Sequence, residues 1–239
     1  MPNLDIFIKT YHKDFEWLFF CLSSIDKFVD GFQNIIIAMP NKDKHLFTID
    51  TKQFSRIHNR VKYIYTNDYG NTYLYQQFIK ITAYQYTEAD YIMYVDSDVV
   101  FNRKSYINES FNSEEKPIIY YTPYEMVGDA ICWQEPTSEL LGEHQSYEFM
   151  RRNCLIFRKS TLIDINTQYP NLEQIIMNSI RFSEFNTIGA WAFKNEFNNY
   201  SFVNTITNPP PPANHIQFWS YSNLNKIDRL KIKQILDQV

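Results

Sequence analysis

Strand-like and helix-like segments alternate, with short links, over the first hundred residues of this 239-residue chain. Short aliphatic and aromatic runs predict four strands, at 4–8, 34–39, 61–65 and 91–95. Segments with apolar residues at helical spacing lie between them and predict helices at 15–29, 45–57 and 72–86. Such alternation predicts an α/β fold with a mostly parallel central sheet that is flanked by helices.

The second half of the sequence is less regular. We predict strands at 118–121 and 154–157, a short helix at 187–194 and a terminal amphipathic helix at 226–236. The polar and aromatic segment 123–153 has the length of a lid or binding loop. No repeat or linker divides the chain, so we expect a single domain over residues 1–239.

Charge and cysteine content restrict the classes of function and location. The net charge of -4 disfavours a nucleic-acid partner, which requires a basic surface. Three widely spaced cysteines without a CxxC pair disfavour a zinc site and favour reduced thiols. We see no signal peptide and no transmembrane segment, and therefore expect a cytoplasmic protein. The basic face of the terminal helix leaves weak peripheral contact with a membrane open.

The motif Asp96-Ser97-Asp98 follows the apolar strand at 91–95 directly. Residues two apart on an extended chain point the same way, so the two carboxylates repel unless a cation lies between them. Hard oxygen ligands favour Mn²⁺ or Mg²⁺, and such an ion can bind the two phosphates of a nucleotide diphosphate. The plain alternative is a pair of acidic residues in a β-turn.

Polar residues near two other elements are candidates for binding the donor. Thr10, Tyr11 and Asp14 follow the first strand and offer a hydroxyl, an aromatic ring and a carboxylate for a base and ribose. Asp14 also suits the N-cap of the helix that begins at Phe15. Gln77 and Lys80 share one helix face, where Lys80 suits phosphate, although an exposed polar face is the commoner meaning of such a pair.

Two residues late in the chain are candidates for the metal site and for catalysis. His215 offers a neutral imidazole ligand for Mn²⁺, or is a surface histidine after a proline run. Glu184 suits a general base that takes the proton of an acceptor hydroxyl. Its alternative role is to complement the N-terminus of a helix.

Together these segments resemble a nucleotide-diphospho-sugar glycosyltransferase of the GT-A (Rossmann-like) type. The chain is similar to a family of small glycosyltransferase-like proteins of bacteria and large DNA viruses. The resemblance runs from the first strand to HIQFWSY and rests on IKTYHKDFEWLFFCLSSIDKF at 8–28, YQQFIK at 75–80, YIMYVDSDVVF at 91–101 and SEFNTIG at 183–189.

The resemblance implies a hexosyltransferase-like enzyme that uses a UDP-sugar or similar donor, Mn²⁺ or Mg²⁺, and a glycan or other hydroxyl acceptor. Residues 1–101 would form the nucleotide-sugar-binding half, and residues 102–239 the acceptor-binding half with the C-terminal helix. Asp98 would bind the metal directly, Asp96 and Ser97 would lie near the ribose or a metal-bound water, and His215 would complete the metal site. With Glu184 as base the reaction inverts the anomeric configuration; without it a retaining course stays open.

Two other functions fit parts of the sequence. The run YIMYVDSDVV also fits the opening motif of haloacid-dehalogenase-type phosphatases, in which Asp96 would be the nucleophile. That motif normally lies on the first strand, whereas about ninety residues precede it here. A non-catalytic module that binds sugar nucleotides is the second alternative, because a fold does not fix a function.

Overall fold

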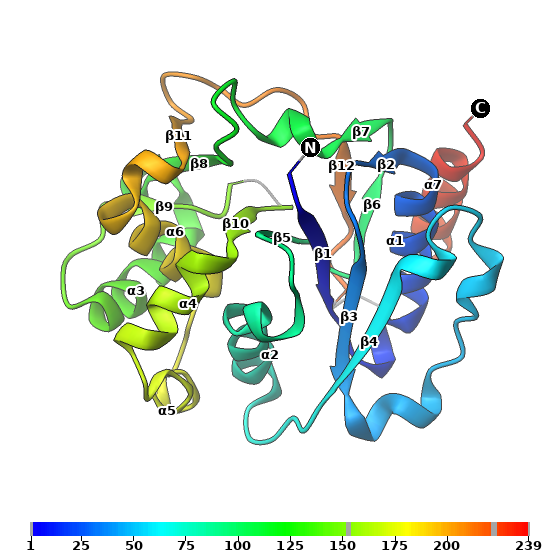
Figure 1. Cartoon of the computed structure of the whole chain (residues 1–239), viewed down its shortest axis with the longest axis horizontal. Coiled ribbons are helices and arrows are strands. Elements are labelled where there is room, and N and C mark those ends of the chain that lie inside the picture. Colours follow the sequence, from blue (N-terminus) through cyan, green and yellow to red (C-terminus); the bar gives the residue numbers. More distant parts are fainter. Residues whose placement is uncertain (1, 152–153, 221–223, 239) are drawn as a thin grey trace.

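A five-stranded sheet, four of whose strands are parallel, forms the centre of the molecule (Figure 1). The computed structural model describes residues 2–151, 154–220 and 224–238. In spatial order the sheet contains β10 (Ile156–Arg158), β5 (Tyr91–Tyr94), β1 (Leu4–Lys9), β3 (Ile35–Pro40) and β4 (Val61–Thr66). Strand β10 is antiparallel to β5, and every other pairing in this sheet is parallel.

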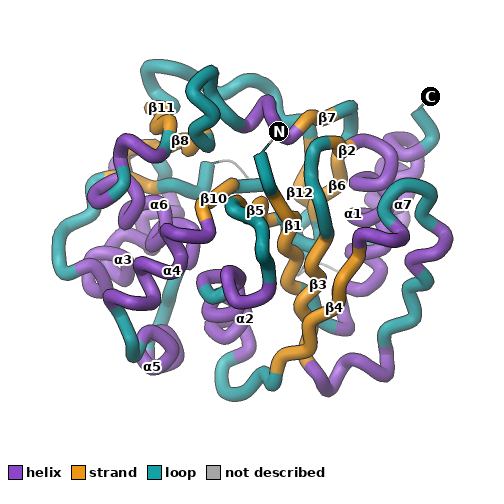
Figure 2. Tube along the Cα trace, in the orientation of Figure 1, coloured by secondary structure: helices purple, strands orange, loops and turns teal. Residues whose placement is uncertain are grey.

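Alternate residues of the central strands enter two different cores. Ile6 and Ile8 belong to the core under α1 (Phe15–Phe28) and α7 (Lys226–Leu236), whereas Phe7 belongs to the core under the opposite layer. Side chains of a strand point alternately to its two faces, so a strand buried on both faces is apolar throughout. Figure 2 shows helical segments on both sides of the strands.

The opposite layer contains five helices, which pack over the second apolar cluster. They are α2 (Thr72–Ile81), α3 (Gln134–Leu141), α4 (Lys159–Gln168), α5 (Leu172–Asn178) and α6 (Glu184–Asn195). Smaller sheets join the remaining strands: β11 (Ser201–Asn204) with β8 (Ile118–Pro123) and β9 (Tyr147–Glu148), β12 (His215–Gln217) with β6 (Val99–Phe101), and β2 (Val29–Asp30) with β7 (Ser105–Tyr106).

The order of the strands creates a switch point between β1 and β5. From β1 the chain proceeds outward to β3 and β4, and then returns to the other side of β1 as β5. The loops that leave the carboxyl ends of β1 and β5 therefore diverge, and in open α/β sheets this divergence forms the ligand crevice. Asp96 follows β5 at this position, as the sequence predicts.

The predicted helix at 45–57 is wrong. The segment instead contains 3₁₀ turns at Asn41–Leu46 and Thr51–Gln53. The carboxylate of Asp26 on α1 accepts hydrogen bonds from the backbone N–H groups of Ser55, Arg56 and Ile57. These amides consequently do not donate to a helical ladder, and Ile57 is buried against α1 in an irregular conformation.

Other predicted elements are confirmed, with shifted ends. The helix at 72–86 stops as an α-helix at Ile81 and continues as a 3₁₀ turn at Ala83–Tyr86. The short helix at 187–194 begins earlier, at Glu184, because the hydroxyl of Ser183 caps it by accepting from the Asn186 N–H. The long segment 123–153 is not a plain loop, since it contains α3 and β9. Within the described residues, no helix is both long enough and apolar enough to cross a membrane.

Candidate active site

A cavity of about 660 Å³ opens at the carboxyl ends of β1 and β5. Seven of the predicted site residues line it together: Asp14, Gln77, Lys80, Asp96, Ser97, Asp98 and Glu184. They come from the start of α1, from α2, from the loop after β5 and from α6. The fold thus collects most of the polar residues that the sequence pattern singled out, and we call this cavity the central pocket.

Asp98 is nearly buried, and the chain after β12 holds its carboxylate. The backbone N–H of Ser220 donates to Asp98 Oδ2 at 2.7 Å. The side-chain amide of Gln217 lies 3.5 Å from Asp98 Oδ1 and 3.5 Å from Asp96 Oδ2. Gln217 therefore spans the two carboxylates of the DxD motif and orients both toward the central pocket.

Asp14 adds a third carboxylate beside the motif. It occupies the N-cap position of α1, but its side chain makes no capping hydrogen bond and instead accepts from Ser97 Oγ at 3.4 Å. Burial and the nearby charge of Asp98 raise the pKa of Asp14 to about 6. Burial and the charge of Asp96 likewise raise the pKa of Asp98. Negative charge is therefore crowded at this end of the pocket.

Lys80 joins two carboxylates from different parts of the chain. Its Nζ lies 2.8 Å from Asp96 Oδ1 and 2.9 Å from Glu184 Oε1. Burial lowers the pKa of Lys80, but the two carboxylates outweigh burial and raise it well above its ordinary value. Lys80 is thus a permanent cation that fixes Asp96 and Glu184, and not the exposed polar residue of the plain alternative.

Gln77 supplies a polar group with no partner. It lines the central pocket at 3% exposure, and neither its amide oxygen nor its amide nitrogen has a hydrogen-bond partner in the part of the chain that the structure describes. Leaving a buried polar atom unpaired costs about 1–3 kcal/mol. A ligand that bonds to this amide would recover that free energy.

The central pocket suits a divalent cation by its chemistry. The carboxylate oxygens of Asp96 and Asp98 are adjacent hard ligands, and the NH2 group of Gln217 lies 3.5 Å from one oxygen of each. Burial is the main cause of the raised pKa values of Asp14 and Asp98, and repulsion between neighbouring carboxylates, which a cation would relieve, adds to it. Among the described residues, no group of three or more His, Cys, Asp or Glu side chains is arranged as a ready metal site.

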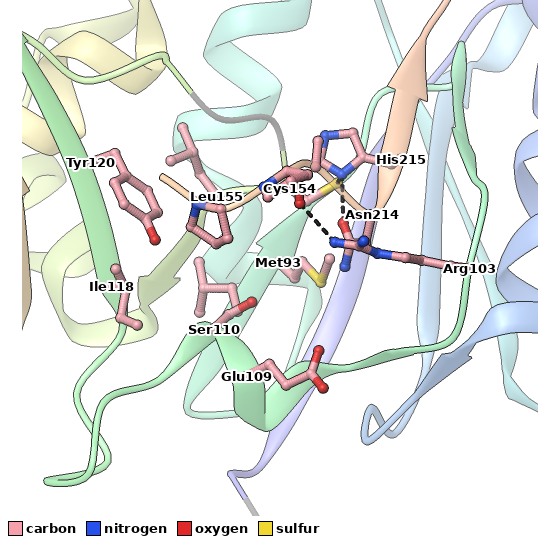
Figure 3. A pocket seen from close by; sticks show the side chains of 14 residues that line it. Met93, Arg103, Glu109, Ser110, Ile118, Tyr120, Cys154, Leu155, Asn214 and His215 are labelled. Atoms are coloured by element: carbon pink, nitrogen blue, oxygen red, sulfur yellow. Dashed lines mark hydrogen bonds between the residues drawn. The ribbon is translucent and has the colours of Figure 1, made fainter. Parts of the chain in front are cut away.

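His215 lies in a different cavity, of about 170 Å³ (Figure 3). Its Nδ1 is 2.8 Å from Asn214 Oδ1 and 3.9 Å from Cys154 Sγ. The register explains this placement: β12 is antiparallel to β6, so Gln217 pairs with Val99, beside Asp98, while His215 pairs with Phe101, two residues further from the motif. The structure therefore brings Gln217, and not His215, to the carboxylates.

Thr10 and Tyr11 do not line the central pocket. Thr10 is buried, and the half-exposed ring of Tyr11 contacts His12 instead. Their neighbour Lys9 does line the pocket, and its Nζ is 3.0 Å from Asp68 Oδ2 in a buried ion pair. Burial lowers the pKa of Lys9, and the charge of Asp68 opposes that shift.

Several polar residues of the central pocket were not singled out by the sequence pattern. These are Tyr73, Gln76, Glu148, Arg151 and Gln217. Gln76 carried a usable signal, since it lies beside Gln77 on the same helix. Glu148 and Arg151 had none, because β9 has only two residues and shows no period.

Comparison with solved structures identifies the architecture. The chain matches LgtC, a galactosyltransferase solved with donor and acceptor sugar analogues, over 98% of this chain and 97% of the other, with a TM-score of 0.59 and 9% identity. It matches a 4-diphosphocytidyl-2C-methyl-D-erythritol synthase from Anaerococcus prevotii over 99% and 97%, with a TM-score of 0.55 and 10% identity. This chain has a GT-A-like fold.

The GT-A-like fold confirms the predicted fold class, namely a mostly parallel central sheet flanked by helices. No family model matches the sequence. A search of curated proteins also gives no match. Identities of 9% and 10% establish the fold and leave the activity to the chemistry of the central pocket.

Proposed function

We propose that the protein is a metal-dependent glycosyltransferase that transfers a sugar from a nucleotide diphosphate to an acceptor hydroxyl. The GT-A-like fold supports this proposal, because one structural neighbour is a galactosyltransferase and another is named for a diphosphocytidyl compound. UDP-sugars are the first donors to test, in keeping with the resemblance of the sequence.

The observation that carries the proposal is the excess of carboxylates. Five carboxylates line the central pocket against three basic side chains: Asp14, Asp96, Asp98, Glu148 and Glu184 against Lys9, Lys80 and Arg151. A diphosphate entering this pocket would meet net negative charge, so its binding requires a cation. Asp98, with Asp96 and Gln217 beside it, would hold Mn²⁺ or Mg²⁺. The ion would neutralise charge that develops on the leaving diphosphate.

The donor would lie across the start of α1 and the face of α2. Asp14 and Ser97 are joined near the carboxyl end of β5 and suit the ribose hydroxyls. Gln77 lines the same pocket, has buried amide atoms without a partner among the described residues, and suits the sugar or the diphosphate. Burial of these groups keeps water from competing for their hydrogen bonds.

Glu184 is the proposed base. Its carboxylate is buried at the first residue of α6 and lines the central pocket, with Lys80 between it and Asp96 of the DxD motif. Lys80 Nζ lies 2.9 Å from Glu184 Oε1 and fixes this oxygen, which leaves Oε2 to accept a proton from the acceptor hydroxyl. Direct attack by that hydroxyl would invert the anomeric configuration. A product of retained configuration would remove Glu184 from this role.

A thermal-shift screen of nucleotide sugars, with and without Mn²⁺, tests the proposal. A donor that binds the native state raises the melting temperature by mass action, and the proposal expects this shift only with the metal. Transfer or slow hydrolysis of the same donor should follow. Binding without turnover, over a broad acceptor panel, would identify a non-catalytic module instead, and absence of any shift would refute the proposal.

The phosphatase alternative has less support. Its motif belongs on the first strand of a sheet, whereas Asp96 follows the fourth strand along the chain in the main sheet. Asp96 Oδ1 is also held by Lys80, which weakens it as a nucleophile. Release of phosphate from simple phosphoesters would be the result that favours this alternative.

A further inference from the structure

The basic side chains of the central pocket differ in how completely neighbouring carboxylates compensate their charge. Lys9 pairs with Asp68, and both side chains are almost fully buried. Lys80 is shared between Asp96 and Glu184. Each ammonium group thus already faces the carboxylates that compensate it, and a ligand would have to compete with those ion pairs.

Arg151 is different, because it is fixed at only one nitrogen. Its Nε donates to Glu148 Oε2 at 2.7 Å, and the other oxygen of Glu148 accepts from the Met150 N–H at 2.9 Å. Glu148 is buried, which makes it a rigid anchor. Within residues 2–151, 154–220 and 224–238, the two terminal nitrogens of Arg151 have no hydrogen-bond partner. The side chain lines the central pocket.

The segment that carries Arg151 is attached to the start of α6. The side-chain oxygen of Asn186 accepts from the Phe149 N–H at 2.8 Å, and the hydroxyl of Ser183 contacts Met150 Sδ. Glu184 lies between these two anchor points in the sequence. Arg151 therefore belongs to the same rigid unit as the proposed base, at the end of the pocket where the sugar would react.

The surroundings of Arg151 suit a sugar ring. Trp133, Phe185 and Met150 line the same pocket and offer aromatic and apolar surface on which a ring can pack. A guanidinium group beside such a surface recognises a planar carboxylate with two parallel hydrogen bonds. The hydroxyl oxygens of a neutral sugar can also accept from the terminal nitrogens, but without the charge that makes the carboxylate pair stronger.

We propose that Arg151 selects a sugar that carries a carboxylate, of the uronic-acid type, at the transfer site. This inference rests on the proposed glycosyltransferase function. The carboxylates that line the pocket repel an acidic sugar, so binding of such a sugar depends on the one guanidinium that can pair with it. The acidic sugar is either the donor or the acceptor, and the experiment has an arm for each.

The donor arm compares UDP-glucuronate with UDP-glucose by calorimetry in the presence of Mn²⁺, with UDP alone as reference. Wild-type protein should bind the glucuronate at least ten-fold more tightly than the glucose. Arg151→Gln should lower glucuronate affinity at least ten-fold and change the affinities for UDP-glucose and UDP less than two-fold. Arg151→Lys, which keeps a charge beside Glu148 but lacks the planar fork, should lose most of the preference while still folding.

The acceptor arm measures binding of methyl glucuronide and methyl glucoside to the complex with UDP and Mn²⁺. A preference for the glucuronide that Arg151→Gln removes supports the proposal with the acid on the acceptor. The exposed Arg181→Gln serves as the matched control and should change nothing in either arm.

The outcomes distinguish failure of the role proposed for Arg151 from failure of the proposed glycosyltransferase function. Equal binding of acidic and neutral sugars in both arms overturns the role of Arg151 and leaves the proposed function intact. Equal weakening of UDP and both donors by Arg151→Gln assigns the residue to the diphosphate, which also overturns the proposal. Failure of wild-type protein to bind UDP or any UDP-sugar refutes the proposed function, and this inference falls with it.

Discussion

Lys80 on α2 and Glu184 on α6 form a buried ion pair, with 2.9 Å between Nζ and Oε1. The two residues are about a hundred positions apart and belong to the two halves that the sequence analysis distinguished. Lys80 also holds Asp96 of the DxD motif at 2.8 Å. One lysine therefore fixes the relative position of the proposed metal ligand and the proposed base.

Replacing Lys80 with methionine should destabilise the protein strongly. The substitution leaves two neighbouring carboxylates without their cation, and loss of one partner of a buried pair costs about 3–5 kcal/mol. Urea unfolding at neutral pH measures the loss. The double variant Lys80→Met with Glu184→Gln should recover part of it, because it removes one of the unpaired charges. Equal stability of wild type and Lys80→Met would mean that the ion pair is not formed.

Glu184→Gln should separate binding from chemistry. The amide keeps the shape of the side chain but cannot accept a proton, so transfer should fall about 10²–10⁴-fold. Donor affinity should change less than two-fold, since Asp98 and Gln77 are untouched. Steady-state kinetics measures the fall in transfer rate, and calorimetry on the same preparation measures the donor affinity. Unchanged turnover would remove Glu184 from the mechanism.

Asp98→Asn should abolish the effect of Mn²⁺ on donor binding. Without metal, the variant should be at least as stable as wild type, because burial and the charge of Asp96 raise the pKa of Asp98 and so disfavour its ionised form. Melting curves with and without Mn²⁺ and a donor test both statements. The exposed Asp129→Asn is the control and should retain the full response. Metal-dependent binding that survives in Asp98→Asn would contradict the metal assignment.

Asp14 should make the metal-free protein less stable as the pH rises. Its pKa is about 6 in the folded protein, against 3.8 in its ordinary state, so the folded state binds the proton more tightly. The stabilising contribution is complete below pH 4 and is lost as the pH rises through 6. With about 1.4 kcal/mol per pKa unit, the loss is on the order of 2–3 kcal/mol. Unfolding in EDTA between pH 4.5 and 7.5 measures it, and Asp14→Asn should flatten the profile.

Gly189→Ala should destabilise the protein, against the usual trend for helices. Alanine normally stabilises a helix by about 1 kcal/mol relative to glycine. Here the added Cβ would lie under 3.0 Å from side-chain atoms of Phe149, the buried residue that follows β9. Overpacking of this kind costs about 1–3 kcal/mol. Thermal melts should show a lower midpoint, whereas Thr167→Ala on the exposed face of α4 should be neutral or stabilising.

The sequence predicted the parts of the site that depend on local pattern. A short apolar run such as 91–94, within an alternation of strands and helices, favours a buried strand, and the residues that follow such a strand lie at the rim of a parallel sheet. This reasoning placed Asp96 and Asp98 correctly at the pocket. The helical period likewise placed Gln77 and Lys80 on one face, although it could not tell that this face is buried.

The pairing of distant segments could not be predicted in the same way. Residue chemistry alone pointed to His215, because imidazole is a common metal ligand. The register of β12 places Gln217 beside Asp98 instead, and a shift of two residues along a strand moves a side chain by about 7 Å. The helix expected at 45–57 failed for a related reason, since Asp26 binds the backbone of that segment from another element.

The bonds from Ser220 and Gln217 to Asp98 span about 120 residues of sequence. During synthesis, a chain that has emerged only as far as residue 200 can already pair β1, β3, β4 and β5, yet it lacks the strand that orients the acidic pair. Affinity for manganese should therefore arise late, after the central sheet has closed. Ribosome-bound chains of increasing length would then include a compact intermediate that does not bind Mn²⁺.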